Sequence, residues 1–306
     1  MSFAPLTARA FSLEGKFANW PARFAVLAAL TLPVAACGSS FDSLDSLSSF
    51  NPMNLFGGEK YSPKVEPDTA PELLYDEGLA DINKKDYDKA TDKFKALEKQ
   101  YEYSQWERKA LLMETFSQYQ NGNFDDAIGT AQRYIGRYST APDLDYVYYL
   151  EAMSYYNQIP DVSRDQDRAQ KASVVFGQIV DKFPKSQYAD DARYKLQVTR
   201  DQLAGQEMMV GRFYLNRHEY TAAINRFRDV LAKYQTTRHA QEALERLTEA
   251  YLALGITNEA QTAAAVLGHN FPDSPWYKDA YALLQGGGLK PHEDPTSWIS
   301  KAFHLS

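Results

Sequence analysis

Five segments of this 306-residue chain repeat one pattern, and the repetition limits the possible folds more than any other feature. Each segment is aligned on an alanine and carries apolar or small residues at offsets 0, 3, 7, 10 and 14. That spacing places the side chains on one stripe of an α-helix, where the small alanine lets a neighbouring helix approach closely. The alanines, at offset 3, are Ala90, Ala127, Ala172, Ala223 and Ala260.

Other residues keep fixed distances from these alanines. Glycine precedes two of them by 12 residues, tyrosine precedes two by 9, and proline follows two by 12: Gly78, Gly211, Tyr214, Tyr251, Pro184 and Pro272. These marks are typical of tetratricopeptide helix pairs, with Gly and Tyr on the first helix and proline ending the second. The alanines lie 37, 45, 51 and 37 residues apart. Because the usual period is about 34 residues, we expect longer helices or turns here.

The pattern predicts an all-α fold, a superhelical array of five tetratricopeptide-like helix pairs over residues 71–285. We divide it into an N-terminal half, 71–184, and a C-terminal half, 185–285. A generic helical bundle with a heptad-like seam is the alternative, although a heptad alone would not place the Gly and Pro marks. The stripes should form the core, while partners of repeat proteins bind the concave face lined mainly by first helices.

The first 36 residues look like a lipoprotein signal peptide. Three basic residues and one acidic residue precede an apolar run, 24–36, which has the length of a signal-peptide core and is short for a membrane span. Small residues then precede the sole cysteine, Cys37, and this arrangement resembles the bacterial lipobox. The resemblance implies that the Cys37 thiol receives diacylglycerol and that the new amine is acylated, which suffices for stable membrane anchoring. The alternative is a plain signal peptide with an incidental cysteine.

The segments on either side of the repeats read as flexible. Residues 37–70 are dominated by Ser, Asp, Gly and Pro, so we predict a tether between the lipid on Cys37 and the folded body. Three glycines, 286–288, open a tail predicted to be flexible over 286–306. Trp298, Ile299, Ala302 and Phe303 can form one short apolar face there, which leaves open whether the tail docks or stays loose.

Composition argues against several functions. The net charge is −7 and the sequence has no basic stripe, so we expect no nucleic-acid partner. A lone cysteine excludes an intrachain disulfide and a multi-cysteine metal site, and the five histidines form no i, i+4 pair. There is no Gly-rich phosphate loop with Lys and no Gly-x-Ser-x-Gly motif. We therefore expect no metal, no cofactor and no enzymatic activity.

Two segments between the stripes carry candidate binding residues. Residues 145–156 hold five tyrosines on one predicted helix, and some of them, such as Tyr146, Tyr148 and Tyr149, should face a groove for extended or aromatic-rich peptide. Packing between repeats is the equally weighted alternative for any one of them. The polar insertion 158–168 is either a rim of such a groove or a simple loop between helices.

Three runs together resemble the BamD family of bacterial outer-membrane lipoproteins. They are 145–149 (Asp-Tyr-Val-Tyr-Tyr), 163–165 (Ser-Arg-Asp) and 183–192, within a match over about residues 70–270. The resemblance implies a lipid-anchored protein on the periplasmic face of the outer membrane, a location that Gly38 after Cys37 also favours. It implies partners as well: the POTRA domains of BamA, other Bam lipoproteins and unfolded outer-membrane proteins.

The resemblance also implies a docking position. An Asn-Arg pair on the second helix of the family's fourth repeat contacts a POTRA domain, and Asn225-Arg226 occupies that place here. Without the resemblance Arg226 would read as a solvated charge. The predicted function is thus a scaffold of β-barrel assembly. The alternatives are a periplasmic repeat adaptor for cell-wall synthesis or division, and a lipoprotein hydrolase whose repeats position substrate.

Overall fold

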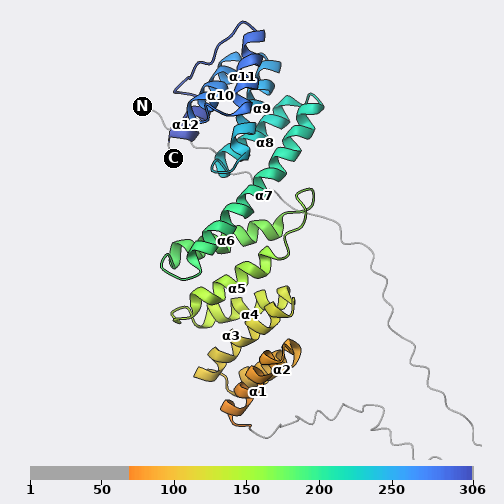
Figure 1. Ribbon diagram of the computed structural model, residues 1–306, viewed down its shortest axis with the longest axis vertical. Helices are drawn as coiled ribbons and strands as arrows, with labels where there is room; N and C mark the ends of the chain where they lie inside the picture. The colour runs from red at the N-terminus through yellow and green to blue at the C-terminus, as the bar shows by residue number, and fades with distance from the viewer. Residues whose placement is uncertain (1–68, 305–306) are drawn as a thin grey trace, which may run out of the picture. The chain divides into compact units, whose positions relative to one another are not determined.

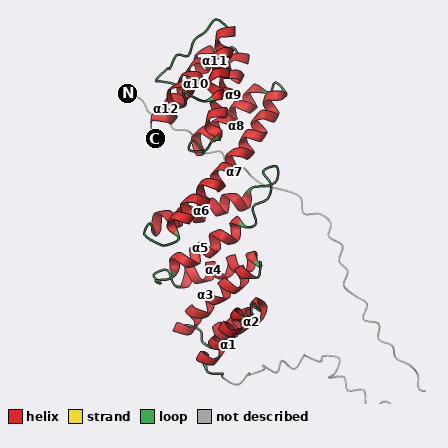
Figure 2. Ribbon diagram, viewed as in Figure 1, coloured by secondary structure: helices red, strands yellow, loops and turns green. Residues whose placement is uncertain are grey.

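The computed structural model describes residues 69–304, which form twelve α-helices and no strand in that range (Figures 1 and 2). The predicted signal peptide, Cys37 and all but the last residues of the predicted tether lie outside the described residues. The helices are α1 (Pro71–Asn83), α2 (Tyr87–Gln100), α3 (Gln105–Gln120), α4 (Phe124–Arg137), α5 (Leu144–Tyr156), α6 (Asp167–Lys182), α7 (Ala189–Asn216), α8 (Tyr220–Lys233), α9 (His239–Ala253), α10 (Thr257–Asn270), α11 (Pro275–Gly286) and α12 (Trp298–His304).

Five helix pairs, α1/α2 through α9/α10, stack in chain order as the predicted superhelical array (Figure 1). Within the five pairs each helix packs on the next, and some first helices also contact one another: α1 with α3, α3 with α5, and α7 with α9. The helix α11 packs on α9 and α10. In repeat proteins the first helices are the ones that mainly line the binding face. The predicted all-α repeat fold is confirmed.

The repeated stripes form the seams between helices. Residues at offsets 3, 7 and 10 have no exposed surface in any of the five second helices: Ala90, Phe94, Leu97; Ala127, Ala131, Tyr134; Ala172, Phe176, Ile179; Ala223, Phe227, Val230; Ala260, Ala264, Leu267. The residue at offset 14 ends each of these helices, and its N–H donates to the carbonyl at offset 10. The sequence pattern therefore specifies both the buried stripe and the helix end.

The turn inside each pair is also repeated. Lys85, Gly122, His218 and Gly255 adopt positive φ angles of 61°, 80°, 60° and 74°, and each lies five residues before its repeat's alanine. This left-handed residue lets the chain reverse directly into the second helix. The third pair lacks the turn because the insertion takes its place.

Two glycines allow first and second helices to touch. A Cβ atom built on Gly78 would lie 2.6 Å from Cζ of Phe94, and one on Gly211 would lie 2.4 Å from Cε1 of Phe227. Both phenylalanines are fully buried, so neither ring can move aside freely. The glycine marks read from the sequence thus permit close helix contact.

Gly78→Ala should lower the free energy of unfolding by about 1–3 kcal/mol, because the new methyl group would overlap the Phe94 ring. Gly129 provides a matched control, since a Cβ atom there meets nothing within 4 Å in the middle of α4. Gly129→Ala should stabilise the protein by about 0.5–1 kcal/mol through helix propensity. Urea midpoints compare the two; equal shifts in the same direction would contradict the packing argument.

The helix α7 has 28 residues and links two packing clusters. Ala192 and Leu196 near its start pack in the cluster built on α3 to α6, whereas Ala204, Met208 and Leu215 pack in the cluster of α8 to α12. The predicted boundary between the halves 71–184 and 185–285 lies just before this helix, which joins the two clusters without a break. The 51-residue spacing between Ala172 and Ala223 reflects this length, whereas the insertion at 158–168 lengthens the spacing between Ala127 and Ala172 to 45 residues.

The predicted flexible tail is wrong for the residues up to His304. After α11, the segment 287–297 runs along α10: the Gln261 side chain donates to the carbonyl of Lys290 at 2.7 Å, and Ser297 donates to Glu259 at 2.7 Å. In α12, Ile299 is fully buried and the Trp298 indole N–H donates to the Tyr251 hydroxyl at 3.2 Å. The reason is that the last helix pair of an array exposes an apolar face that needs a cap.

Candidate partner-binding site

Tyrosines gather where the first helices of three successive pairs meet. Tyr119 ends α3, Tyr146 and Tyr149 lie on α5, and Tyr188 precedes α7; we call these four residues the tyrosine surface. The Tyr188 ring stacks on Tyr146 at 5.2 Å and on Tyr149 at 4.8 Å between centroids, with interplanar angles of 24° and 23°. Each of the four residues is half-buried, so the surface offers both flat apolar rings and hydroxyl groups.

Hydrogen bonds hold this surface in place. The Tyr149 hydroxyl donates to Oδ2 of Asp191 at 2.6 Å, and the Asn157 amide donates to the Tyr119 hydroxyl at 3.2 Å. Burial, and then the neighbouring phenols, raise the pKa of Tyr146 to about 12; burial and the Asp191 carboxylate raise the pKa of Tyr149. The phenols of Tyr146 and Tyr149 therefore stay neutral at physiological pH and act as hydrogen-bonding, not charged, groups.

Tyr148, predicted as a groove residue, lies elsewhere. It is 7% exposed, its ring contacts Phe183 at 5.7 Å, and Lys182 donates to its hydroxyl at 2.9 Å. Tyr148 thus belongs to the seam between α5 and α6, and the prediction that it lines a binding surface is wrong. Side chains on one helix point to different faces, and Tyr148 points toward α6 while Tyr146 and Tyr149 point toward Tyr188.

The insertion packs against the middle of α7. Gln166 is 1% exposed, and its side-chain amide donates to the carbonyls of Asp161 and Arg164 at 2.9 and 3.0 Å. Gln202 on α7 donates to the carbonyl of Pro160 at 3.2 Å. The insertion is therefore an ordered loop, stabilised by hydrogen bonds from the buried side chain of Gln166 to its backbone. The polar sequence of the insertion does not predict this role of Gln166.

Arg226 on α8 has a partner within the chain. Its guanidinium donates to Oε2 of Glu207 on α7 at 3.1 Å, and its side chain remains 42% exposed. Asn225 beside it is exposed. The structure thus places the predicted docking pair on the surface, with Arg226 oriented by a carboxylate that sequence reasoning did not identify.

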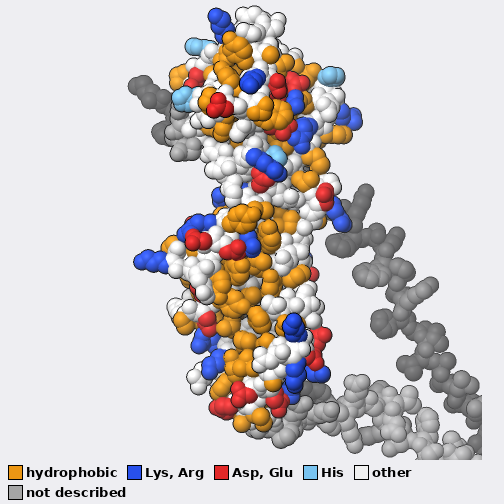
Figure 3. Space-filling model, viewed as in Figure 1, with side chains coloured by type: hydrophobic (Ala, Val, Ile, Leu, Met, Phe, Trp, Pro, Cys, Tyr) orange, Lys and Arg blue, Asp and Glu red, His pale blue; other side chains and the backbone are white. Residues whose placement is uncertain are grey.

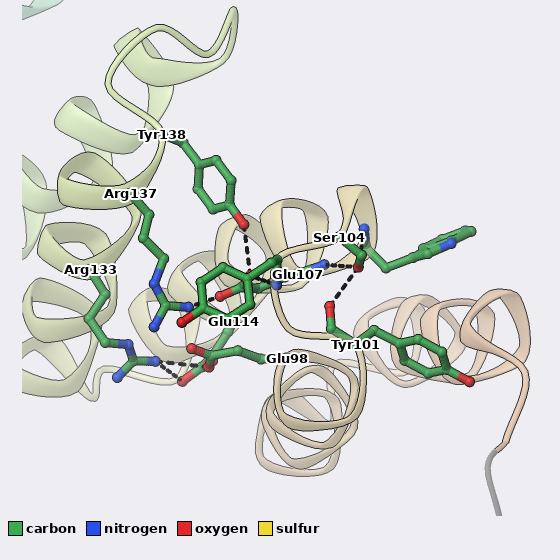
Figure 4. Close-up of polar contacts among 10 residues, drawn as sticks. Glu98, Tyr101, Ser104, Glu107, Glu114, Arg133, Arg137 and Tyr138 are labelled. Carbon is green, nitrogen blue, oxygen red and sulfur yellow. Dashed lines mark hydrogen bonds and ion pairs between the residues drawn. The ribbon is translucent and has the colours of Figure 1, made fainter.

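Buried carboxylates form a network in the second pair (Figure 4). Glu107 and Glu114 on α3 have no exposed surface. Glu107 pairs with Arg137 and accepts a hydrogen bond from the Tyr138 hydroxyl at 2.9 Å, while Glu114 lies 3.5 Å from a guanidinium nitrogen of Arg133. From sequence alone these glutamates look like solvated helix positions. They instead tie α3 to α4, just before the tyrosine surface.

The buried position of Glu114 makes stability depend on pH. Desolvation, opposed by Arg133 and reinforced by Glu98, raises its pKa from 4.5 to about 7. The folded protein then holds this proton more tightly than the unfolded chain, so stability should fall as pH rises from about 4.5 through 7.

Glu114→Gln should therefore be more stable than the wild-type protein at pH 8, on the order of 1–2 kcal/mol, and the difference should vanish near pH 4.5. Urea unfolding at the two pH values measures it. Glu102→Gln, a change at an exposed position on the preceding turn, is the control and should shift neither value. A variant that is less stable at pH 8 would show that Glu114 functions chiefly as the charged partner of Arg133.

In residues 69–304 no group of three or more His, Cys, Asp or Glu side chains is placed to hold a metal ion. Within the same range, no helix combines the length and hydrophobicity required to span a bilayer.

Figure 3 shows hydrophobic side chains gathered on the visible face over α3 to α6. The stacked helix pairs and the tyrosine surface define a tetratricopeptide-type scaffold whose surface suits protein partners.

Comparison with known proteins agrees with this class. The profile of a family described as outer membrane lipoprotein (YfiO) matches residues 67–267. The outer membrane protein assembly factor BamD of Caulobacter vibrioides is 43% identical over 224 residues, 73% of this chain and 73% of that protein. BamD of Rickettsia prowazekii is 41% identical over 212 residues, 69% of this chain and 84% of that protein. The chain belongs to the BamD family of outer membrane lipoproteins.

Proposed function

We propose that this protein is a non-catalytic scaffold of β-barrel assembly, anchored by lipid on Cys37 to the periplasmic face of the outer membrane. Family membership supports the role, since the relatives are named outer membrane protein assembly factors. The lipobox-like sequence that ends at Cys37 supports the anchor. Residues 37–70 would then act as a tether that gives the repeats freedom to reach partners.

The observation that carries the proposal is the tyrosine surface. Stacked, half-buried phenol rings with hydrogen-bonded hydroxyls bind extended, aromatic-rich segments well, because rings stack on rings and the hydroxyls pair with backbone amides. Unfolded outer-membrane proteins present such segments, so we assign Tyr119, Tyr146, Tyr149 and Tyr188 to substrate binding.

A second surface on α8 would bind the other members of the machine. We assign the POTRA domains of BamA to Asn225 and Arg226, which lie on the surface beside the long helix α7. An arginine that is oriented by Glu207 yet 42% exposed can pair with a partner carboxylate at low entropic cost. Other Bam lipoproteins would use the remaining repeats.

Depletion of the protein tests the proposal against the alternative, an adaptor for cell-wall synthesis or division. Outer-membrane β-barrel proteins should fall together, and wild-type protein should restore them. A Tyr149→Ala, Tyr188→Ala variant should restore them only partly, whereas Tyr194→Ala, at a tyrosine that is 67% exposed and outside the surface, should restore them fully. Normal barrel levels with defective cell-wall synthesis would favour the adaptor.

A further inference from the structure

The docked tail contacts α8 as well as α10. The guanidinium carbon of Arg228 on α8 lies 4.7 Å from the centroid of the Trp298 ring, at the start of α12. The Trp298 indole N–H donates to the Tyr251 hydroxyl at 3.2 Å, and Trp298 packs against the C-terminal cluster. The next residue, Ile299, has no exposed surface, so packing holds the start of α12 in place. The indole thus supports an arginine of α8 from below.

The charge of Arg228 is not offset by a carboxylate. Its side chain is exposed, and in the part of the chain that the structure describes its guanidinium forms neither an ion pair nor a hydrogen bond. The nearby carboxylates are already engaged, because Asp229 pairs with Lys233 at 3.0 Å and Glu207 pairs with Arg226 at 3.1 Å. Arg228 therefore gives this side of α8 an excess positive charge.

Stacking leaves the hydrogen-bonding edge of Arg228 free. An aromatic ring attracts the flat face of a guanidinium, whereas the five N–H donors lie in the plane and point outward. Trp298 therefore orients Arg228 without using the donors that can pair with a carboxylate. Because the side chain is already oriented, pairing with a partner costs little conformational entropy. Arg226, by contrast, already donates to Glu207, so a partner carboxylate would have to share that guanidinium.

Arg228 borders the same exposed face of α8 as the predicted docking pair. Residues three apart on an α-helix are neighbours, so Arg228 lies beside Asn225. Residues two apart point in nearly opposite directions, so Arg226 and Arg228 lie on either side of Asn225. Arg226 faces α7, where Glu207 lies, and Arg228 faces α12. The exposed face of α8 is thus bordered by one arginine on each side.

We propose that Arg228, oriented by Trp298, pairs with a carboxylate of the partner protein that binds α8. The inference rests on the proposed function, which assigns this surface to BamA, and it adds an acidic side chain of BamA next to the contact of Asn225. A planar guanidinium can hold such a carboxylate through two parallel hydrogen bonds. Trp298 is a positioning residue that acts through Arg228. The docked tail thereby contributes to binding as well as covering the end of the array.

Binding of the full mature chain to BamA in detergent micelles tests the proposal. Arg228→Ala should weaken the affinity about tenfold and make it less sensitive to salt, because one charge pair is lost. Arg168→Ala is the matched control: Arg168 also lies over an aromatic ring, Tyr155, but on α6, and its loss should leave the affinity unchanged. An affinity unaffected by Arg228→Ala would overturn the proposal. If Arg226→Glu nevertheless weakens binding sharply, only this inference fails; if the wild type does not bind BamA, the proposed function fails with it.

A double-mutant cycle tests the positioning role of Trp298. Trp298→Leu keeps an apolar side chain in the cluster but removes the ring face, and it should weaken the affinity about threefold. In a chain that already carries Arg228→Ala, the same change should have no further effect on affinity. An equal loss with and without Arg228 would mean that Trp298 acts through stability alone and would overturn its positioning role. Melting temperatures of the four proteins measure the effect of Trp298→Leu on stability separately.

Discussion

Phe227→Ala should lower the free energy of unfolding of the C-terminal cluster by about 3–5 kcal/mol. Phe227 has no exposed surface, lies at offset 7 of its stripe, and packs so closely on α7 that only glycine fits at position 211. Removing the ring leaves a cavity between α7 and α8 that the long helix cannot easily collapse. Trp276 and Trp298 pack against the same cluster, so tryptophan fluorescence in urea follows its unfolding.

Phe213→Ala is the matched control for this substitution. Phe213 also lies on α7, but it is 55% exposed; its ring meets Tyr214 edge-on, and the Arg217 guanidinium lies over it at 5.3 Å from the centroid. The change should cost less than about 1 kcal/mol. If both phenylalanines cost the same, the stripe would not be the source of stability. Because repeat arrays unfold by neighbouring units, the comparison should be made within this one cluster.

Cys37→Ser should remove the protein from the outer-membrane fraction almost completely. Each buried methylene of an acyl chain contributes about 0.8 kcal/mol to membrane binding, so loss of every chain removes the anchor outright. Mass spectrometry of the N-terminal peptide and density-gradient fractionation of envelopes measure acylation and location. The described residues offer no helix that could take over as a membrane span.

The control for this prediction separates export from anchoring. A chain in which a cleavable secretory signal replaces residues 1–36 and serine replaces Cys37 should appear soluble in the periplasm. Retention of that chain in the outer-membrane fraction at the wild-type level would mean that protein contacts, not lipid, hold it there.

The repeated stripes were predictable because each helix seam is a local pattern of small and large side chains. Ala90, Phe94 and Leu97 are fully buried as their spacing indicates, and so are their counterparts in the other four pairs. The sequence pattern places the residue at offset 14, such as Tyr101, on the stripe, and the structure adds that this residue ends the helix.

The binding surfaces were harder to predict, because they depend on which side of a helix meets a distant segment. The five tyrosines of residues 145–156 do not alternate with polar residues at helical spacing. The sequence therefore does not distinguish the buried Tyr148 from Tyr149, which stacks on Tyr188. Nothing in the sequence marks Glu114 as buried, since its partner Arg133 lies on the next helix. The apolar face of Trp298 and Ile299 indicates a tail that docks, whereas the three glycines at 286–288 indicate a flexible one. The structure agrees with the apolar face.

Co-purification measures whether the protein belongs to a BamA-containing machine and docks there through α8. Tagged protein is recovered from detergent-solubilised envelopes, and bound BamA is compared between wild type and Arg226→Glu. In the Arg226→Glu variant the new glutamate faces Glu207, and this repulsion alone can lower stability. The double variant Arg226→Glu, Glu207→Arg restores the internal ion pair and should restore the wild-type melting temperature. We expect BamA with the wild type and little with either variant. BamA recovered equally from all three would discard Arg226 as the anchor, and absence of BamA even from the wild type would contradict the account.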